Sequence, residues 1–179
     1  MRLLAAVLFI LCFHTSFSQE YGDKEFYLID SLQLDALSEN DRALIDSSLT
    51  VFHQSENDSI KLYTLFAMVE NCWDIKVWPK YNLYLFQMTV ERMKNGSDDI
   101  TKKELLALKG HCLNNEGFYQ SRLGVTDLAL KNYYRSLEIF IQVEDKQSAG
   151  YLLNNIASML RAQGQHSKSL EYTYESYKI

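Results

Sequence analysis

Two stretches of this sequence resemble one another at an interval of forty residues. The first is CLNNEGFYQSRLG, from Cys112 to Gly124, and the second is LLNNIASMLRAQG, from Leu152 to Gly164. Each contains a pair of asparagines and ends in glycine. Similarity at a fixed interval of this size is typical of a protein built from stacked helical units.

The likeness extends beyond the two quoted stretches. Aligned without a gap, residues 113–138 and 153–178 are identical at seven of twenty-six positions. The identical pairs are Leu113/Leu153, Asn114/Asn154, Asn115/Asn155, Gly124/Gly164, Leu130/Leu170, Tyr134/Tyr174 and Ser136/Ser176. Gly117/Ala157 and Ala129/Ser169 stay small, which predicts that the two helices of a unit cross closely at these positions.

The rest of the chain also predicts helices, because it has a single proline and only seven glycines. Helical periodicity covers residues 39–54, 58–72, 79–95, 101–123, 126–144, 147–163 and 167 to the chain end. Asp58 or Ser59 can cap the second of these helices, and Thr101 with Glu104 reads as a capping box. Pro79 and Gly96 suit the two ends of a helix whose apolar stripe is Leu83, Phe86, Val90 and Met93. We therefore predict an all-α fold of antiparallel helix pairs.

The spacing of Gly117, Gly124, Ala129, Tyr133 and Ser136 is similar to that of tetratricopeptide repeats (TPR), in the long-repeat branch with units of about forty residues. This resemblance implies a right-handed superhelical solenoid. Its units would be a degenerate helix pair at 58–96, a first repeat at 101–144 and a second at 147–179, truncated in its second helix. We expect residues 19–57, which we name the lead-in, to form one or two helices before the first helix pair.

The first eighteen residues have the pattern of a secretory signal peptide, with Arg2, an apolar run from Leu3 to Phe13 and a small-residue cleavage site ending at Ser18. The run is too short for a permanent membrane-spanning helix, so cleavage is preferred to a retained anchor. We expect an exported, periplasmic chain, or the periplasmic part of an inner-membrane protein.

The start, the stretch VWPKYN at 77–82 and the repeated LNN together resemble the N-terminal sensor regions of Bacteroidetes signalling proteins. In those proteins the repeats precede a membrane helix and a histidine kinase or LuxR-type regulator domain. This resemblance implies signal transduction, with a membrane link only through a segment beyond Ile179.

The sequence also stops inside a helix, where Leu170, Tyr174 and Tyr177 would face a missing neighbour. We therefore expect that the uncapped C-terminal end allows self-association.

Composition argues against several classes of function. The formal charge of −5, without a lysine or arginine cluster, argues against nucleic-acid binding. No cofactor, metal or catalytic motif is recognisable from residue spacing, so we expect no enzymatic activity.

Cys72 and Cys112 are interpreted as two buried thiols, with one disulfide as the alternative. Trp73 and Trp78 are interpreted as a hydrophobic cap on the first helix pair.

A binding role remains, and the resemblance assigns it to the concave face that the first helix of each TPR unit lines. The residues that this register predicts to face the groove are His111, Asn114, Phe118, Arg122, Tyr151, Asn154, Ser158 and Arg161. Asparagine side chains at matching positions can bind the backbone of an extended protein or peptide segment. Alternatively, Asn114 and Asn154 make hydrogen bonds between helices. The same register turns Asn155 toward the packing side.

Overall fold

The computed structural model describes residues 20–179, and the predicted signal peptide lies outside this range. Eight α-helices and one short 3-10 helix make up the fold of the described residues. Their bounds are Lys24–Tyr27 (α1), Leu34–Ala36 (η1), Glu39–Gln54 (α2), Asp58–Asn71 (α3), Trp78–Asn95 (α4), Lys102–Arg122 (α5), Thr126–Gln142 (α6), Lys146–Ala162 (α7) and His166–Lys178 (α8). The predicted all-α fold is confirmed, and the predicted helices are found with bounds shifted by at most two residues.

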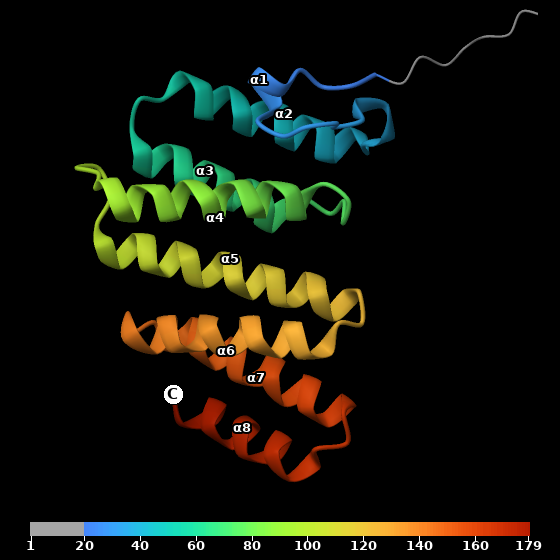
Figure 1. The fold of residues 1–179 in the computed structure, drawn as a ribbon, viewed down its shortest axis with the longest axis vertical. Coiled ribbons are helices and arrows are strands. Elements are labelled where there is room, and N and C mark those ends of the chain that lie inside the picture. Colours follow the sequence, from blue (N-terminus) through green and yellow to red (C-terminus); the bar gives the residue numbers. More distant parts are fainter. Residues whose placement is uncertain (1–19) are drawn as a thin grey trace, which may run out of the picture.

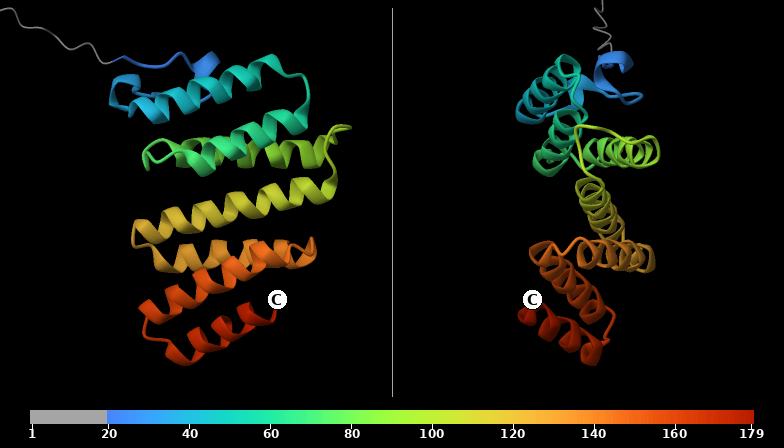
Figure 2. Two further views of the ribbon diagram at one scale, coloured as in Figure 1. Left: turned by 180° about the vertical axis from the view of Figure 1, so that it is seen from behind. Right: turned by 90° about the vertical axis from the view of Figure 1, so that its left-hand side faces the viewer.

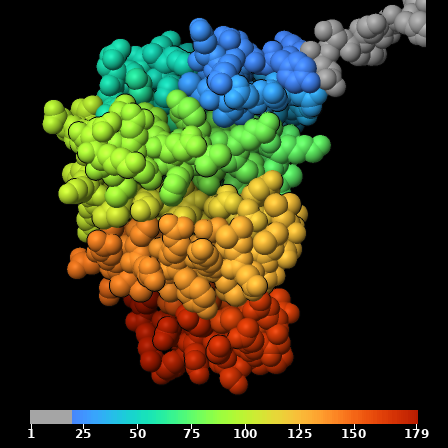
Figure 3. Space-filling model, in the orientation of Figure 1, coloured from blue at the N-terminus to red at the C-terminus, as the bar shows by residue number. Residues whose placement is uncertain are grey.

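The helices follow one another through space in the order of the sequence. All extensive contacts between the described helices join neighbours in the chain, from α1 with α2 to α7 with α8. Figures 1 and 2 show this succession from α2 at one end of the molecule to α8 at the other. On the surface it appears as successive bands of the chain (Figure 3). Adjacent antiparallel helices are therefore the packing unit, as predicted.

Local sequence signals determine where several helices begin. The capping box of α5 is complete: the Thr101 hydroxyl accepts from the Glu104 amide, and the Glu104 carboxylate accepts from the Thr101 amide at 2.8 Å. Helix α3 is capped one residue earlier than expected, because the Asn57 side chain accepts from the Ile60 amide at 2.9 Å. Helix α4 begins at Trp78, one residue before Pro79.

Three of the turns between helices share one backbone geometry. After α5, α6 and α7 the chain passes through a residue of positive φ, namely Gly124 (77°), Glu144 (60°) and Gly164 (75°). At each turn the next residue's amide donates to a carbonyl five residues back, as Val125 does to Gln120 at 2.9 Å. This pair of features is the Schellman motif, which satisfies the last carbonyls of a helix. Successive helices therefore reverse direction in the same way.

Small side chains allow α5 to approach α6 closely. A Cβ atom on Gly117 would lie 2.7 Å from the Tyr133 ring and 3.2 Å from the Ala129 carbonyl oxygen. The equivalent position in the next pair is Ala157, whose carbonyl accepts a 2.8 Å hydrogen bond from Ser169 of α8. The aligned pairs Gly117/Ala129 and Ala157/Ser169 thus occupy the same crossing in the two halves of the repeat.

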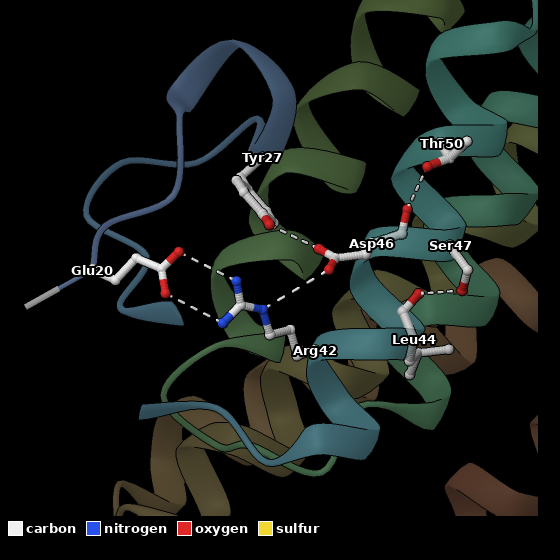
Figure 4. A network of polar contacts seen from close by, with 7 residues as sticks. All are labelled: Glu20, Tyr27, Arg42, Leu44, Asp46, Ser47 and Thr50. Atoms are coloured by element: carbon white, nitrogen blue, oxygen red, sulfur yellow. Dashed lines mark hydrogen bonds and ion pairs between the residues drawn. The ribbon is translucent and has the colours of Figure 1, made fainter. Parts of the chain in front are cut away.

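Buried apolar residues form two clusters in the described chain. The first runs from Tyr27 in the lead-in to Cys112 of α5, and the second from Ala129 of α6 to Leu160 of α7. The lead-in is also tied to α2 by polar contacts (Figure 4). The Tyr27 hydroxyl donates to Asp46 at 2.8 Å, and Arg42 binds Glu20 at 3.4 Å. The N-terminal segment therefore covers α2 and belongs to the first core.

Two expectations about apolar side chains are wrong. Trp78 is buried as expected, but Trp73 is 90% exposed in the connection between α3 and α4 and caps nothing. The expected stripe of α4 is rotated as well, since Leu83 is exposed whereas Tyr81 and Leu85 are fully buried. In both places the sequence is apolar on more than one side, so periodicity alone does not choose the buried face.

Candidate functional site

Helices α3, α5 and α7 together line two adjacent hollows, which we name the α3–α5–α7 groove. The first hollow has a volume of about 280 Å³, and its lining residues are Val69, Glu70, Cys72, Trp78, Asn114, Asn115, Phe118 and Asn155. The second has a volume of about 370 Å³, and its lining residues are Glu70, His111, Asn114, Phe140, Gln147, Ser148, Tyr151, Leu152 and Asn155. Glu70, Asn114 and Asn155 line both hollows, so the two form one continuous surface.

A series of side-chain hydrogen bonds runs across the groove from α7 to α3. Asn155 Nδ2 donates to Asn114 Oδ1 at 3.4 Å, and Asn114 Nδ2 donates to Asn115 Oδ1 at 3.4 Å. Asn115 Nδ2 then donates to Glu70 Oε1 at 2.7 Å. The last bond is short and assisted by charge, whereas the two amide–amide bonds are long and therefore weak. The amides nearest α7 are thus the easiest to re-pair with a ligand.

His111 contributes an aromatic wall to the second hollow. Its ring lies between Phe66, at 4.7 Å between centroids, and Phe140, at 4.8 Å. Burial lowers the pKa of His111 below its ordinary value of 6.5, although Glu70 and Asp145 act in the opposite direction. The imidazole is accordingly neutral at pH 7 and brings no positive charge to the groove.

Four of the eight predicted groove residues line this groove. They are His111, Asn114, Phe118 and Tyr151. Phe118 is about half exposed and Tyr151 about two-thirds exposed, so both aromatic rings are accessible from solvent. The remaining four, Arg122, Asn154, Ser158 and Arg161, are exposed residues that do not line either hollow.

The second asparagine pair follows its expected orientations only in part. Asn155, expected on the packing side, does hydrogen-bond to Asn114 of α5, but it also lines both hollows. Asn154 instead accepts a 3.0 Å hydrogen bond from Ser176 of α8 and lines a separate hollow of about 340 Å³. The reason is the face that α7 turns toward α5: it includes Met159, whose sulfur accepts from Ser121 of α5 at 3.2 Å, and Asn155 lies one turn before it.

Sequence reasoning missed Glu70, Trp78, Asn115 and Asn155 as groove residues. Glu70 lies in α3, in the degenerate helix pair, where no residue-by-residue alignment with the later repeats connects it with Asn115, forty-five residues later. Asn115 and Asn155 could have been found, because they are an identical pair in the aligned repeats. Only the hydrogen bonds show that both asparagines of α5, and the second asparagine of α7, line the groove.

Two cysteine thiols lie in and near the groove. Cys72 and Cys112 are free and buried, and burial raises the pKa of Cys72 to about 11 and of Cys112 to about 12. Both thiols are therefore protonated and unreactive at neutral pH. Within residues 20–179 no three histidine, cysteine or acidic side chains gather where they could hold a metal ion.

None of the helices described here is both long and apolar enough to cross a membrane. Comparison with known proteins gives no relative: no protein family, no curated protein and no solved structure matches this chain.

Proposed function

We propose that this chain is a non-catalytic interaction module of the tetratricopeptide type, a right-handed solenoid that binds an extended peptide segment in the α3–α5–α7 groove. The observation that carries the proposal is the groove itself. Amide side chains from α5 and α7 meet there at 3.4 Å, beside the accessible rings of Phe118 and Tyr151. An extended backbone presents alternating donors and acceptors, and asparagine can satisfy either kind.

Three features support the repeat architecture in this proposal. The aligned small residues occupy equivalent helix crossings, as Gly117 with Ala129 and Ala157 with Ser169 show. The Schellman turns at Gly124 and Gly164 are also forty residues apart and have the same hydrogen bonds. The groove, finally, draws on α3, α5 and α7, the first helix of each pair in the repeat register.

An alternative role for the asparagines is purely structural, since Asn154 and Asn155 both hydrogen-bond to other helices. The bond lengths favour binding for Asn155. At 3.4 Å its bond to Asn114 contributes little to stability, so a peptide can replace it at small cost. Asn154, with its 3.0 Å bond from Ser176, fits the structural role better.

The test is a binding scan of the full chain against an array of random decapeptides, with Asn155→Ala compared with wild type. We expect the variant to bind the best decapeptides roughly tenfold more weakly, the effect of about one hydrogen bond, with less than about 1 kcal/mol lost from the free energy of unfolding. Ser158→Ala, on the same helix but outside the groove, is the matched control and should change neither. The proposal fails if no decapeptide binds, or if Asn155→Ala lowers stability and leaves binding unchanged.

A sensor role within a larger exported signalling protein is a second proposal, and it has support from the sequence alone. The signal-peptide pattern, VWPKYN and the LNN repeats provide that support. The genomic sequence beyond Ile179 tests it. A segment of about twenty apolar residues followed by a kinase or helix-turn-helix signature would support the role, and a stop codon directly after Ile179 would refute it.

A further inference from the structure

Among residues 20–179, the first hollow of the groove is lined by one acidic side chain and by no basic one. Its lining residues other than Glu70 are asparagines, aromatic and aliphatic side chains and Cys72. In the second hollow Glu70 is again the only lining residue with a formal charge at neutral pH, because the pKa of His111 is lowered. Any ligand that fills the groove therefore meets a negative charge without a compensating cation from the protein.

The Glu70 carboxylate retains capacity to accept hydrogen bonds. Asn115 occupies Oε1 at 2.7 Å and thereby fixes the orientation of the group. Oε2 accepts no hydrogen bond from any residue between Glu20 and Ile179. A carboxylate held on one side and open on the other is suited to receive an ammonium or guanidinium group.

Aromatic rings complete the first hollow. The Trp78 and Phe118 rings lie 6.2 Å apart between centroids, tilted by 36°, and both line the same hollow as Glu70. Aromatic faces attract cations and also cover the aliphatic stem of a lysine or arginine side chain. The hollow thus offers a contact for each part of such a side chain.

The electrostatic surroundings favour a cation further. Glu70 and Asp145, from two different parts of the chain, are both close enough to His111 to act on its pKa, and both carry a negative charge. The chain as a whole carries a formal charge of −5. An acidic segment would be repelled from the groove and a basic one attracted.

We propose that the hollow formed by Glu70, Trp78 and Phe118 binds a lysine or arginine side chain of the peptide that occupies the groove. This inference rests on the proposed function and specifies its partner: an extended segment with a basic residue at the position that meets α3. Glu70 provides the charge, Asn115 positions it, and the half-exposed Phe118 ring covers the stem of the bound side chain, with the buried Trp78 ring beside it.

The experiment uses the full chain and four pools of decapeptides, acetylated and amidated at their ends. Position five is fixed as arginine, lysine, methionine or glutamate, and every other position is random. Since Glu70 is exposed, we expect the arginine and lysine pools to bind only about fivefold more tightly than the methionine pool. The glutamate pool should bind most weakly. Raising the salt concentration should reduce the arginine preference.

Glu70→Gln is the decisive variant, because it keeps the shape and removes the charge. It should bind the arginine and methionine pools equally, so that the fivefold preference for arginine is lost. Glu171→Gln makes the same change on the exposed surface of α8 and should leave the fivefold preference intact. Should Glu70→Gln fail to fold, the salt dependence of wild-type binding decides: a preference that does not decrease with salt overturns the inference.

The outcomes separate this inference from the proposed function. Equal binding of all four pools, still weakened by Asn155→Ala, would leave peptide binding standing and refute the basic side chain. An arginine preference that survives in Glu70→Gln would show that the cation binds elsewhere, and also refutes the inference. Binding by no pool would refute both.

Discussion

Gly117 and Gly150 are both helical glycines, but a side chain would meet different surroundings at each. A Cβ atom on Gly117 would lie 2.7 Å from the buried Tyr133 ring, whereas on Gly150 the nearest atom is the Ser176 carbonyl oxygen at 4.0 Å. We expect Gly117→Ala to lower the free energy of unfolding by about 1–2 kcal/mol. Gly150→Ala should raise it by about 0.5–1 kcal/mol, because alanine favours the helix. Urea unfolding of both variants measures this, and equal effects would contradict the close crossing of α5 and α6.

The lowered pKa of His111 predicts a loss of stability in mild acid. Burial places the folded-state pKa below the ordinary 6.5, so as pH falls the unfolded chain takes up its proton first. The contribution is fully present above about pH 6.5 and is lost as pH falls through the folded-state pKa. His111→Gln should therefore reduce the dependence of the free energy of unfolding on pH below about 6.5. Glu104 and Asp145, whose pKa values are lowered from 4.5 and 3.8, act at lower pH. If the free energy of unfolding depended on pH in the same way in the variant and in the wild type, His111 would not be the cause of the acid sensitivity.

The sequence predicted several residues of the groove correctly, but it predicted the orientation of their side chains less well. His111, Asn114, Phe118 and Tyr151 were named from repeat register and lie together in the groove. The same register did not separate Asn154 from Asn155 correctly: Asn155 bonds to Asn114 of α5 and lines both hollows, whereas Asn154 bonds to Ser176 of α8. Neighbouring residues on a helix differ by about 100°, so the helix that each side chain meets depends on tertiary packing. The place of Glu70 in the groove could not be predicted from the sequence, because it depends on how α3 packs beside α5.

Among the elements, the turns provide the sharpest test of the repeat geometry. The three Schellman turns are alike in backbone, but Gly124 and Gly164 have no side chain whereas Glu144 has one at a φ of 60°. A left-handed conformation costs a residue with a Cβ roughly 1 kcal/mol. Glu144→Gly should therefore raise the free energy of unfolding by about 0.5–1 kcal/mol, and Gly124→Ala should lower it by a similar amount. No atom lies within 4 Å of a Cβ on Gly124, so clashes do not contribute. Thermal unfolding of the pair measures the two effects, and changes of the same sign would be inconsistent with this geometry.

Helix bounds were the most predictable part of the fold, because Asn57, Thr101, Glu104 and the glycines act on their own neighbourhoods. Buried faces were less predictable. In α4 the fully buried residues include Thr89, and Asn82 is buried with a 3.0 Å hydrogen bond to the Cys112 carbonyl. Polar residues inside a core obscure the apolar period, which explains the misplaced stripe.

For the molecule as a whole, stability should decrease toward α8. Ser169 is the only buried residue of that helix, and Leu170, Tyr174 and Tyr177 are exposed. Helix α5, by contrast, has buried residues from Leu105 to Gly117 and packs against α4 and α6. We expect amide hydrogens of α8 to exchange at least about tenfold faster than those of α5, because local opening of α8 exposes little apolar surface. Native-state hydrogen exchange tests this, and uniform protection along the chain would argue against it.

The contacts between helices also bear on how the chain reaches its structure. Since the extensive contacts among the described helices join only neighbours in the sequence, few distant segments must find one another during folding, and such topologies fold fast. Each helix needs only the one before it to begin packing. An N-terminal part of the chain can therefore acquire its core, from Tyr27 to Cys112, while later residues are still being synthesised. The order of the helices in space is then also the order in which they can form.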